Sequence, residues 1–106
     1  MFVSIHCNSV ANPTAHGTET IHFPASTRGR RLAQDIQTAL IAVNGLRDRG
    51  VKAMNLAVLR LTRMPAALVE LAFLSNPHEA YLLGQNSFRE TSAKGIAEGI
   101  RVYAAR

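Results

Sequence analysis

Cysteine, tryptophan and long hydrophobic runs are scarce or absent in this chain of 106 residues. Cys7 is the only cysteine, so no disulfide can form within the chain, and cysteine usage does not indicate a redox compartment. No apolar run reaches the ~18 residues that a membrane-spanning helix needs. No basic segment precedes an apolar stretch after Met1, so we expect no signal peptide at this start of the chain.

Charged residues are also few, at 18%, and positive charge predominates. The net charge of +5 favours an anionic partner such as nucleic acid, acidic lipid or a bacterial cell-wall polymer. With no tryptophan, only two tyrosines and no matching motif, we expect no nucleic-acid binding. Hydrophobic residues make up 47% of the chain, which is typical of one small folded domain over residues 1–106.

Hydrophobic patterning predicts strands that alternate with helices. We expect strands at 2–5, 18–23, 57–61 and 66–71, with a polar, basic loop over 46–56. This alternation predicts an α/β three-layer sandwich with a mostly parallel sheet. The first strand is almost wholly apolar, as if neighbours covered both of its faces, so the chain resembles the second half of a larger domain.

Three helices have recognisable ends. One should begin at Ser26 or Thr27 and stop at Asn44-Gly45, and the last should cover about 86–104. Between them, Asn76 caps a helix with Pro77 at its first position and Glu79 in a capping box. Two apolar stripes should face the core: Leu32, Ile36 and Leu40, and Phe88, Ile96 and Ile100.

Two titratable residues stand at or near the ends of apolar strands. His6 follows FVSI, and Glu70 lies within AALVELAF. Ligands bind beyond the carboxyl ends of strands in open α/β sheets, so both side chains could face one crevice as a metal ligand and a general base. His6 has a structural alternative as a hydrogen-bonded strand-end residue. Glu70 has one as the buried ion-pair partner of Arg60.

Five segments in order resemble the zinc-dependent N-acetylmuramoyl-L-alanine amidases, which hydrolyse peptidoglycan. The segments are SIHCNS (4–9), GTET (17–20), DRGVK (48–52), VLRLTRMPAALVELAFLSNPHE (58–79) and GIAEGIRVY (95–103). The resemblance covers residues 2 to 103. It implies a cell-envelope or secreted location and an amidase that cuts the amide between N-acetylmuramic acid and L-alanine of the stem peptide.

The resemblance also implies roles for single residues. His6 matches the last of three zinc ligands, and Glu70 matches the catalytic glutamate of the VE-x-x-F-x-SN pattern. Substrate contacts are implied for three further residues, Asn8, Glu19 and Arg60, and Arg60 could hold a stem-peptide carboxylate. Each has a structural alternative: Asn8 could cap its loop, Glu19 could pair with an arginine, and Arg60 could pair with Glu70.

The resemblance leaves the zinc site incomplete. Two further ligands belong to an upstream segment that the chain does not contain, so we expect an N-terminally truncated domain, without the family's first strands and helices, that is a weak or inactive amidase. Among local substitutes, only His16 in the loop is a candidate. We expect His22 and His78 on the surface, and Cys7 in the core.

A second interpretation comes from a different class of function. The chain could be a non-catalytic remnant that binds cell wall or associates with itself. The unfinished sheet should expose an edge at residues 2–6, which predicts a homodimer or a domain swap.

Overall fold

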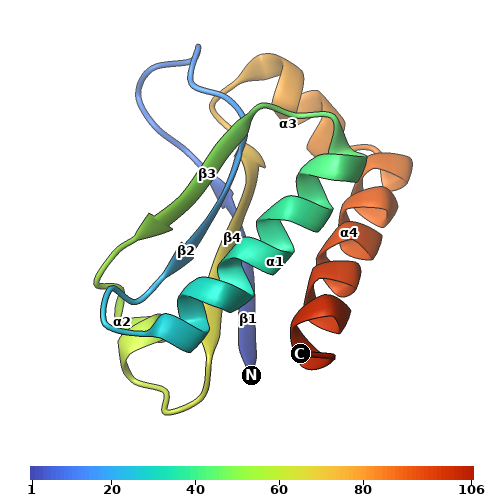
Figure 1. Cartoon of the computed structure of the whole chain (residues 1–106). Helices are drawn as coiled ribbons and strands as arrows, with labels where there is room; N and C mark the ends of the chain where they lie inside the picture. The colour runs from blue at the N-terminus through green and yellow to red at the C-terminus, as the bar shows by residue number, and fades with distance from the viewer.

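A four-stranded sheet in the order β1-β4-β2-β3 forms the centre of the computed structural model, which describes residues 1–106 (Figure 1). The strands are β1 (Phe2–Asn8), β2 (Thr18–His22), β3 (Asp48–Ala53) and β4 (Ala66–Phe73). β1 is parallel to β4 and β2 is parallel to β3, while β2 and β4 are antiparallel. The predicted α/β class with a mostly parallel sheet is therefore confirmed, with one antiparallel junction in its middle.

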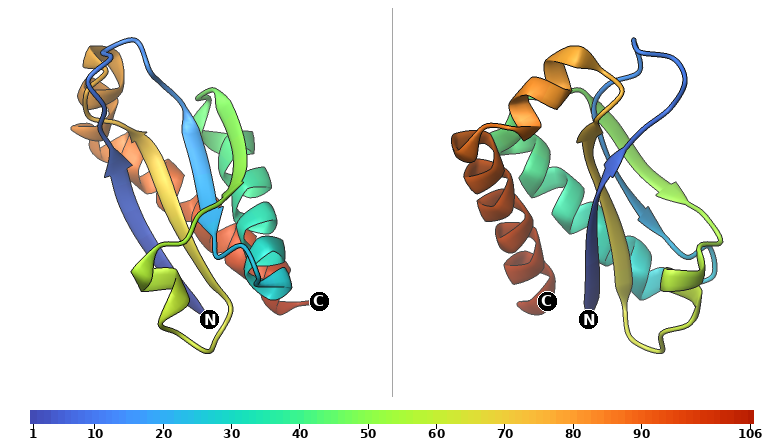
Figure 2. Two further views of the ribbon diagram at one scale, coloured as in Figure 1. Left: turned by 90° about the vertical axis from the view of Figure 1, so that its left-hand side faces the viewer. Right: turned by 180° about the vertical axis from the view of Figure 1, so that it is seen from behind.

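Two long helices cover one face of this sheet. α1 (Thr27–Asn44) and α4 (Asn86–Ala104) lie side by side there, as the views of Figures 1 and 2 show together. The other face carries only the single-turn helix α2 (Ala57–Arg60), and α3 (Pro77–Leu83) joins the end of β4 to α4 (Figure 2). The outer layer on that side is thus one short helix. No helix is both long enough and apolar enough to cross a membrane.

The central strand β4 divides the core between its two faces. Ala67, Val69 and Leu71 pack against α1 and α4, whereas Ala66 and Leu68 pack against α2 and β2. This split follows from the period-2 alternation of a strand that is buried on both sides. On the helical face, the predicted stripes are confirmed: Leu32, Ile36 and Leu40 are fully buried, Ile96 is buried, and Phe88 and Ile100 pack at its margin.

The predicted helix ends are confirmed by their caps. The Ser26 hydroxyl accepts the N–H of Gly29 at the start of α1, and Gly45 ends that helix with a φ of 71°. The Asn76 side chain accepts the N–H of Glu79, as an N-cap should. Glu79 itself departs from the expected capping box, because its carboxylate bonds to other segments of the chain instead of the start of its own helix.

Four local predictions are wrong. Residues 57–61 are not a strand: Ala57–Arg60 form α2, and Leu59 is buried against the sheet. The expected loop over 46–56 contains β3, an edge strand whose polar residues face solvent or pair with β2. Cys7 is exposed because β1 is also an edge strand, with no element beyond it. His22 is 6% exposed, not on the surface.

Candidate active site

The strand register aligns three titratable residues across three neighbouring strands. Glu70 in β4 is the register partner of His6 in β1 and also of Glu19 in β2. Register partners point to the same face of a sheet. Because Val69 and Leu71, on either side of Glu70, face α1 and α4, the row of His6, Glu70 and Glu19 lies on the opposite face. Strand pairing alone therefore assembles this row.

Glu70 is the one residue of the eight in β4 that is half-buried, while the other seven are buried. Its Oε2 is inaccessible to solvent and has no hydrogen-bond partner. Burial, and to a smaller extent the neighbouring Glu19 carboxylate, raise the pKa of Glu70, while His6 opposes the shift. A carboxyl group with a raised pKa and a free oxygen is a proton acceptor placed for use in chemistry.

Glu19 differs from Glu70 because its charge is neutralised. The Arg49 Nε lies 2.9 Å from Oε1, and the Lys52 Nζ lies 3.1 Å from Oε2. Both bases come from β3, and the Asn8 amide donates a weaker bond to Oε1 at 3.4 Å. Glu19 is thus held by two basic side chains, and its carboxylate contributes to the raised pKa of Glu70.

His6 is exposed at the open side of the row. Its Nε2 lies 2.7 Å from the hydroxyl of Ser4, which is two residues away on the same strand face. Cys7 points to the other face, where it lines an apolar groove with Ile5 and Leu71. Partial burial and the Glu70 charge raise the pKa of the Cys7 thiol, which keeps it protonated and a poor ligand.

The structure brings together four of the five residues predicted for the site. His6, Glu70, Glu19 and Asn8 are neighbours, and Asn8 also caps its loop by accepting the N–H of Ser9. Arg60 is the exception. Its Nη1 donates to the Asn55 side chain at 2.6 Å, and it makes no ion pair with Glu70, so the ion-pair alternative for Glu70 is wrong.

A complete metal site is not present among these residues. No group of three His, Cys, Asp or Glu side chains is placed to hold a metal ion. His16 is exposed and bonds to the carbonyl of Thr14, and His22 bonds to the carbonyl of Phe23. His6 and the free oxygen of Glu70 are suitable donors. Zinc sites in proteins, however, have four protein ligands, or three protein ligands and a bound water. The set in this chain does not fit zinc by itself.

Glu79 is a buried structural residue close to the site, and the sequence indicates only a helix-capping role for it. It is 2% exposed, and its carboxylate accepts the N–H groups of Gly17 at 2.9 Å and Phe73 at 2.8 Å. These bonds tie the end of β4 to the loop that follows His6. Burial of the third position of a capping box is not visible in a sequence, because the partners lie 6 and 62 residues away.

Comparison with known proteins gives one consistent family. Residues 1–102 match the family model for N-acetylmuramoyl-L-alanine amidase. The chain is 42% identical to an uncharacterized cell wall amidase of Bacillus anthracis and 36% identical to the N-acetylmuramoyl-L-alanine amidase LytC of Bacillus subtilis, over 97% of its length and 21% of each relative. The crystal structure of an N-acetylmuramoyl-L-alanine amidase from Clostridium difficile superposes with a TM-score of 0.93 at 37% identity, over 97% of this chain and 56% of that one. The chain therefore spans about half or less of the proteins it matches.

Proposed function

Because the chain belongs to the N-acetylmuramoyl-L-alanine amidase family, we propose that His6 and Glu70 form part of a centre for hydrolysing the amide between N-acetylmuramic acid and L-alanine in peptidoglycan. The observation that carries this proposal is Glu70: an unpaired carboxylate with a raised pKa, held beside an imidazole on an otherwise apolar strand. Burial of such a group without a partner has an energetic cost, and that cost is typical of functional sites.

Glu70 is the general base in this proposal. It accepts a proton from the water that attacks the amide carbonyl, and it returns that proton to the departing amine nitrogen of L-alanine. The raised pKa of Glu70 suits both steps, because the carboxylate binds the proton more readily and keeps it until it passes to the departing amine nitrogen. Glu19 contributes by its charge, which opposes ionisation of Glu70.

His6 is proposed as one zinc ligand. If bound there, a zinc ion would polarise the carbonyl of the scissile amide and activate a water. One imidazole and one carboxylate do not hold this ion, so its other ligands have to come from outside these 106 residues or from a second molecule. We therefore expect these 106 residues alone to be a weak or inactive amidase. A cell-envelope or secreted location goes with this substrate.

Substrate binding is proposed for Asn8, Glu19 and Arg60. Asn8 and Glu19 border the row that contains Glu70, so they can contact the groups beside the scissile amide. Arg60 lies elsewhere on the same face of the sheet, where its guanidinium can bind a carboxylate.

A second candidate function is self-association of a non-catalytic remnant. The N–H of Phe2 donates to the carbonyl of Pro65, directly before β4. Because backbone groups alternate in direction along a strand, those of Val3, Ile5 and Cys7 point to the free edge of β1. This edge carries no charged side chain other than a histidine when protonated, and Ile5 is 57% exposed. Such an edge is able to pair with a second copy.

Calorimetric titration of the 106-residue chain with zinc tests the metal proposal. The wild-type chain is compared with His6→Ala, and with His78→Ala as a matched control on the exposed start of α3. One zinc per chain or per dimer, lost only in His6→Ala, supports His6 as a ligand. Zinc binding that survives in His6→Ala contradicts it. Absence of binding to the wild-type chain favours the non-catalytic remnant.

Hydrolysis is tested on purified cell-wall sacculi. The amino groups of L-alanine that are released measure the reaction. If the chain has activity with zinc present, Glu70→Gln should reduce it at least ~100-fold, which is the usual contribution of a general base. A reduction of less than about twofold would remove Glu70 from the mechanism.

A further inference from the structure

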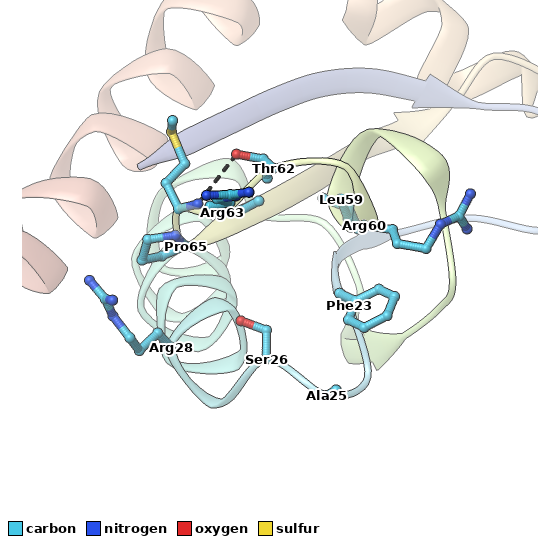
Figure 3. A pocket seen from close by; sticks show the side chains of 11 residues that line it. Phe23, Ala25, Ser26, Arg28, Leu59, Arg60, Thr62, Arg63 and Pro65 are labelled. Carbon is cyan, nitrogen blue, oxygen red and sulfur yellow. Dashed lines mark hydrogen bonds between the residues drawn. The ribbon is translucent and has the colours of Figure 1, made fainter.

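A pocket lies away from the row that contains His6 and Glu70. It has a volume of about 260 Å³ and is enclosed by the start of α1, by α2 and by the beginning of β4 (Figure 3). Phe23, Ser26 and Leu59 line its walls. Ala66 also lines it, four residues before Glu70 on β4, so the pocket is about 13 Å along that strand from the candidate base. It is separate from the row of His6, Glu70 and Glu19, and it shares only Arg60 with the residues proposed to bind substrate.

Three arginines surround this pocket. Arg28 comes from α1, Arg60 from α2 and Arg63 from the turn before β4. In Figure 3, Arg28 and Arg60 stand on opposite sides of the pocket with their side chains extended outward, and Arg63 lies between them. All three are exposed, so rotation about their side-chain bonds, which is fast on the surface, can turn each guanidinium over the pocket.

The positive charge of these arginines is not compensated. No carboxylate lines the pocket, and the four ion pairs of the molecule lie elsewhere. Arg60 donates one hydrogen bond, to the neutral side chain of Asn55, and the guanidinium groups of Arg28 and Arg63 make none. Three guanidinium groups around one opening repel each other unless an anion lies among them.

The first turn of α1 adds to this imbalance. It contains Arg28 and Arg30 and no acidic residue, and Arg31 follows directly. Cations near a helix N-terminus are unfavourable because that end carries partial positive charge. Gly29 allows the turn to approach the start of β4, where a Cβ would lie 3.0 Å from the carbonyl oxygen of Ala66. The helix end thus forms one wall of the pocket, and an anion there would offset both unfavourable terms.

We propose that this pocket binds a phosphate group. A phosphate presents three or four oxygens and up to two negative charges, which matches several guanidinium forks at once. A single carboxylate has two oxygens and one charge, which one arginine satisfies. The phosphate can be free or can belong to a phosphodiester polymer, and the chemistry of recognition is the same for both. The site needs neither zinc nor the amidase reaction.

Calorimetry with inorganic pyrophosphate at low salt tests the proposal on the whole chain. We expect saturable binding at one site, weakened about tenfold or more by Arg60→Gln and by Arg63→Gln, since each loses a charged hydrogen-bond donor. Arg47→Gln is the matched control, because Arg47 is exposed, belongs to no ion pair and lies at the other end of α1. It changes the net charge equally and should alter affinity less than about twofold.

Three outcomes would overturn this proposal. They are no saturable binding of pyrophosphate by the wild-type chain, an equal loss of affinity in Arg47→Gln, or acetate displacing pyrophosphate as effectively as inorganic phosphate does. Backbone NMR spectra of each variant identify any that fail to fold. A glycerol-phosphate oligomer then separates the sources. Tighter binding than pyrophosphate indicates the polymer, and equal or weaker binding indicates free phosphate. Zinc titration of Arg63→Gln should match the wild-type result, because Arg63 has no part in the proposed zinc centre, so failure here is distinct from failure of the metal proposal.

Discussion

His6 and Glu70 are register partners on adjacent parallel strands, and so their side chains rise from the same face of the sheet. This relationship is fixed by backbone pairing and not by a side-chain bond, because neither oxygen of Glu70 bonds to the imidazole. The carboxylate is therefore held close to His6 while keeping a free oxygen. That combination costs stability and leaves the group available for proton transfer.

The pH dependence of stability should reveal this cost. Burial raises the pKa of Glu70 in the folded state above its unfolded value of 4.5, so ionisation disfavours the native fold. The contribution of Glu70 to stability is fully present below pH 4.5 and is lost as the pH rises through the folded pKa. Glu70→Gln has no such loss. We expect Glu70→Gln to be more stable than wild type near pH 7 and to lose that advantage below pH 4.5, measured by urea unfolding.

Asp35→Asn is the control of opposite sign for that experiment. Hydrogen bonds from Arg106 lower the pKa of Asp35, so its contribution is present above the unfolded value of 3.8 and is lost as the pH falls through the folded pKa. Asp35→Asn should therefore be less stable than wild type at neutral pH. A Glu70→Gln difference that grows toward acid pH would contradict the direction of the Glu70 shift.

Glu79 should matter for stability more than any other carboxylate. Glu79→Ala leaves the N–H groups of Gly17 and Phe73 unpaired in a buried place, which should lower the free energy of unfolding by about 3 kcal/mol. Denaturant unfolding measures this loss. Glu90→Ala, on the exposed side of α4, is the control and should change stability by less than about 0.5 kcal/mol. Equal changes in the free energy of unfolding of the two variants would mean that the hydrogen bonds of Glu79 do not stabilise the fold.

Sequence patterns located the elements whose signals are local. Caps identified the starts of α1 and α3, and the apolar run of β4 identified the central strand, so Glu70 could be placed on a strand before its neighbours were known. β3 escaped detection because an edge strand needs few apolar residues. Its Arg49 and Lys52 lie in a segment whose sequence predicts a loop, and only the folded structure shows that they pair with Glu19.

The helix α2 and the buried His22 show the same limit. Four residues are too few to display a 3.6-residue period, so the apolar Leu59 was consistent with a strand. His22 is buried because β2 is an interior strand between β4 and β3, which depends on strand order. Strand order is a tertiary property, and no window of the sequence contains it.

The free edge of β1 gives a prediction about assembly. Ile5 directs its N–H outward, so Ile5→Pro removes one donor from the edge without removing a bond to β4. If a second copy pairs there, the wild-type chain should show a mass that rises with concentration in analytical ultracentrifugation. Ile5→Pro should remain monomeric. A wild-type chain that stays monomeric at several hundred micromolar would exclude this mode of pairing.

The contact between α1 and α4 depends on a glycine. A Cβ at Gly99 would collide with the backbone of Ile36, and α4 can approach α1 this closely only because Gly99 has no side chain. Backbone cannot yield as a flexible side chain does, so the two helices would have to separate. We expect Gly99→Ala to lower the free energy of unfolding by about 1–3 kcal/mol, despite the higher helix propensity of alanine. Ala97→Gly, on the exposed side of the same helix, isolates the propensity effect and should cost about 1 kcal/mol. Stabilisation by Gly99→Ala would mean that the helices pack less closely than this contact requires.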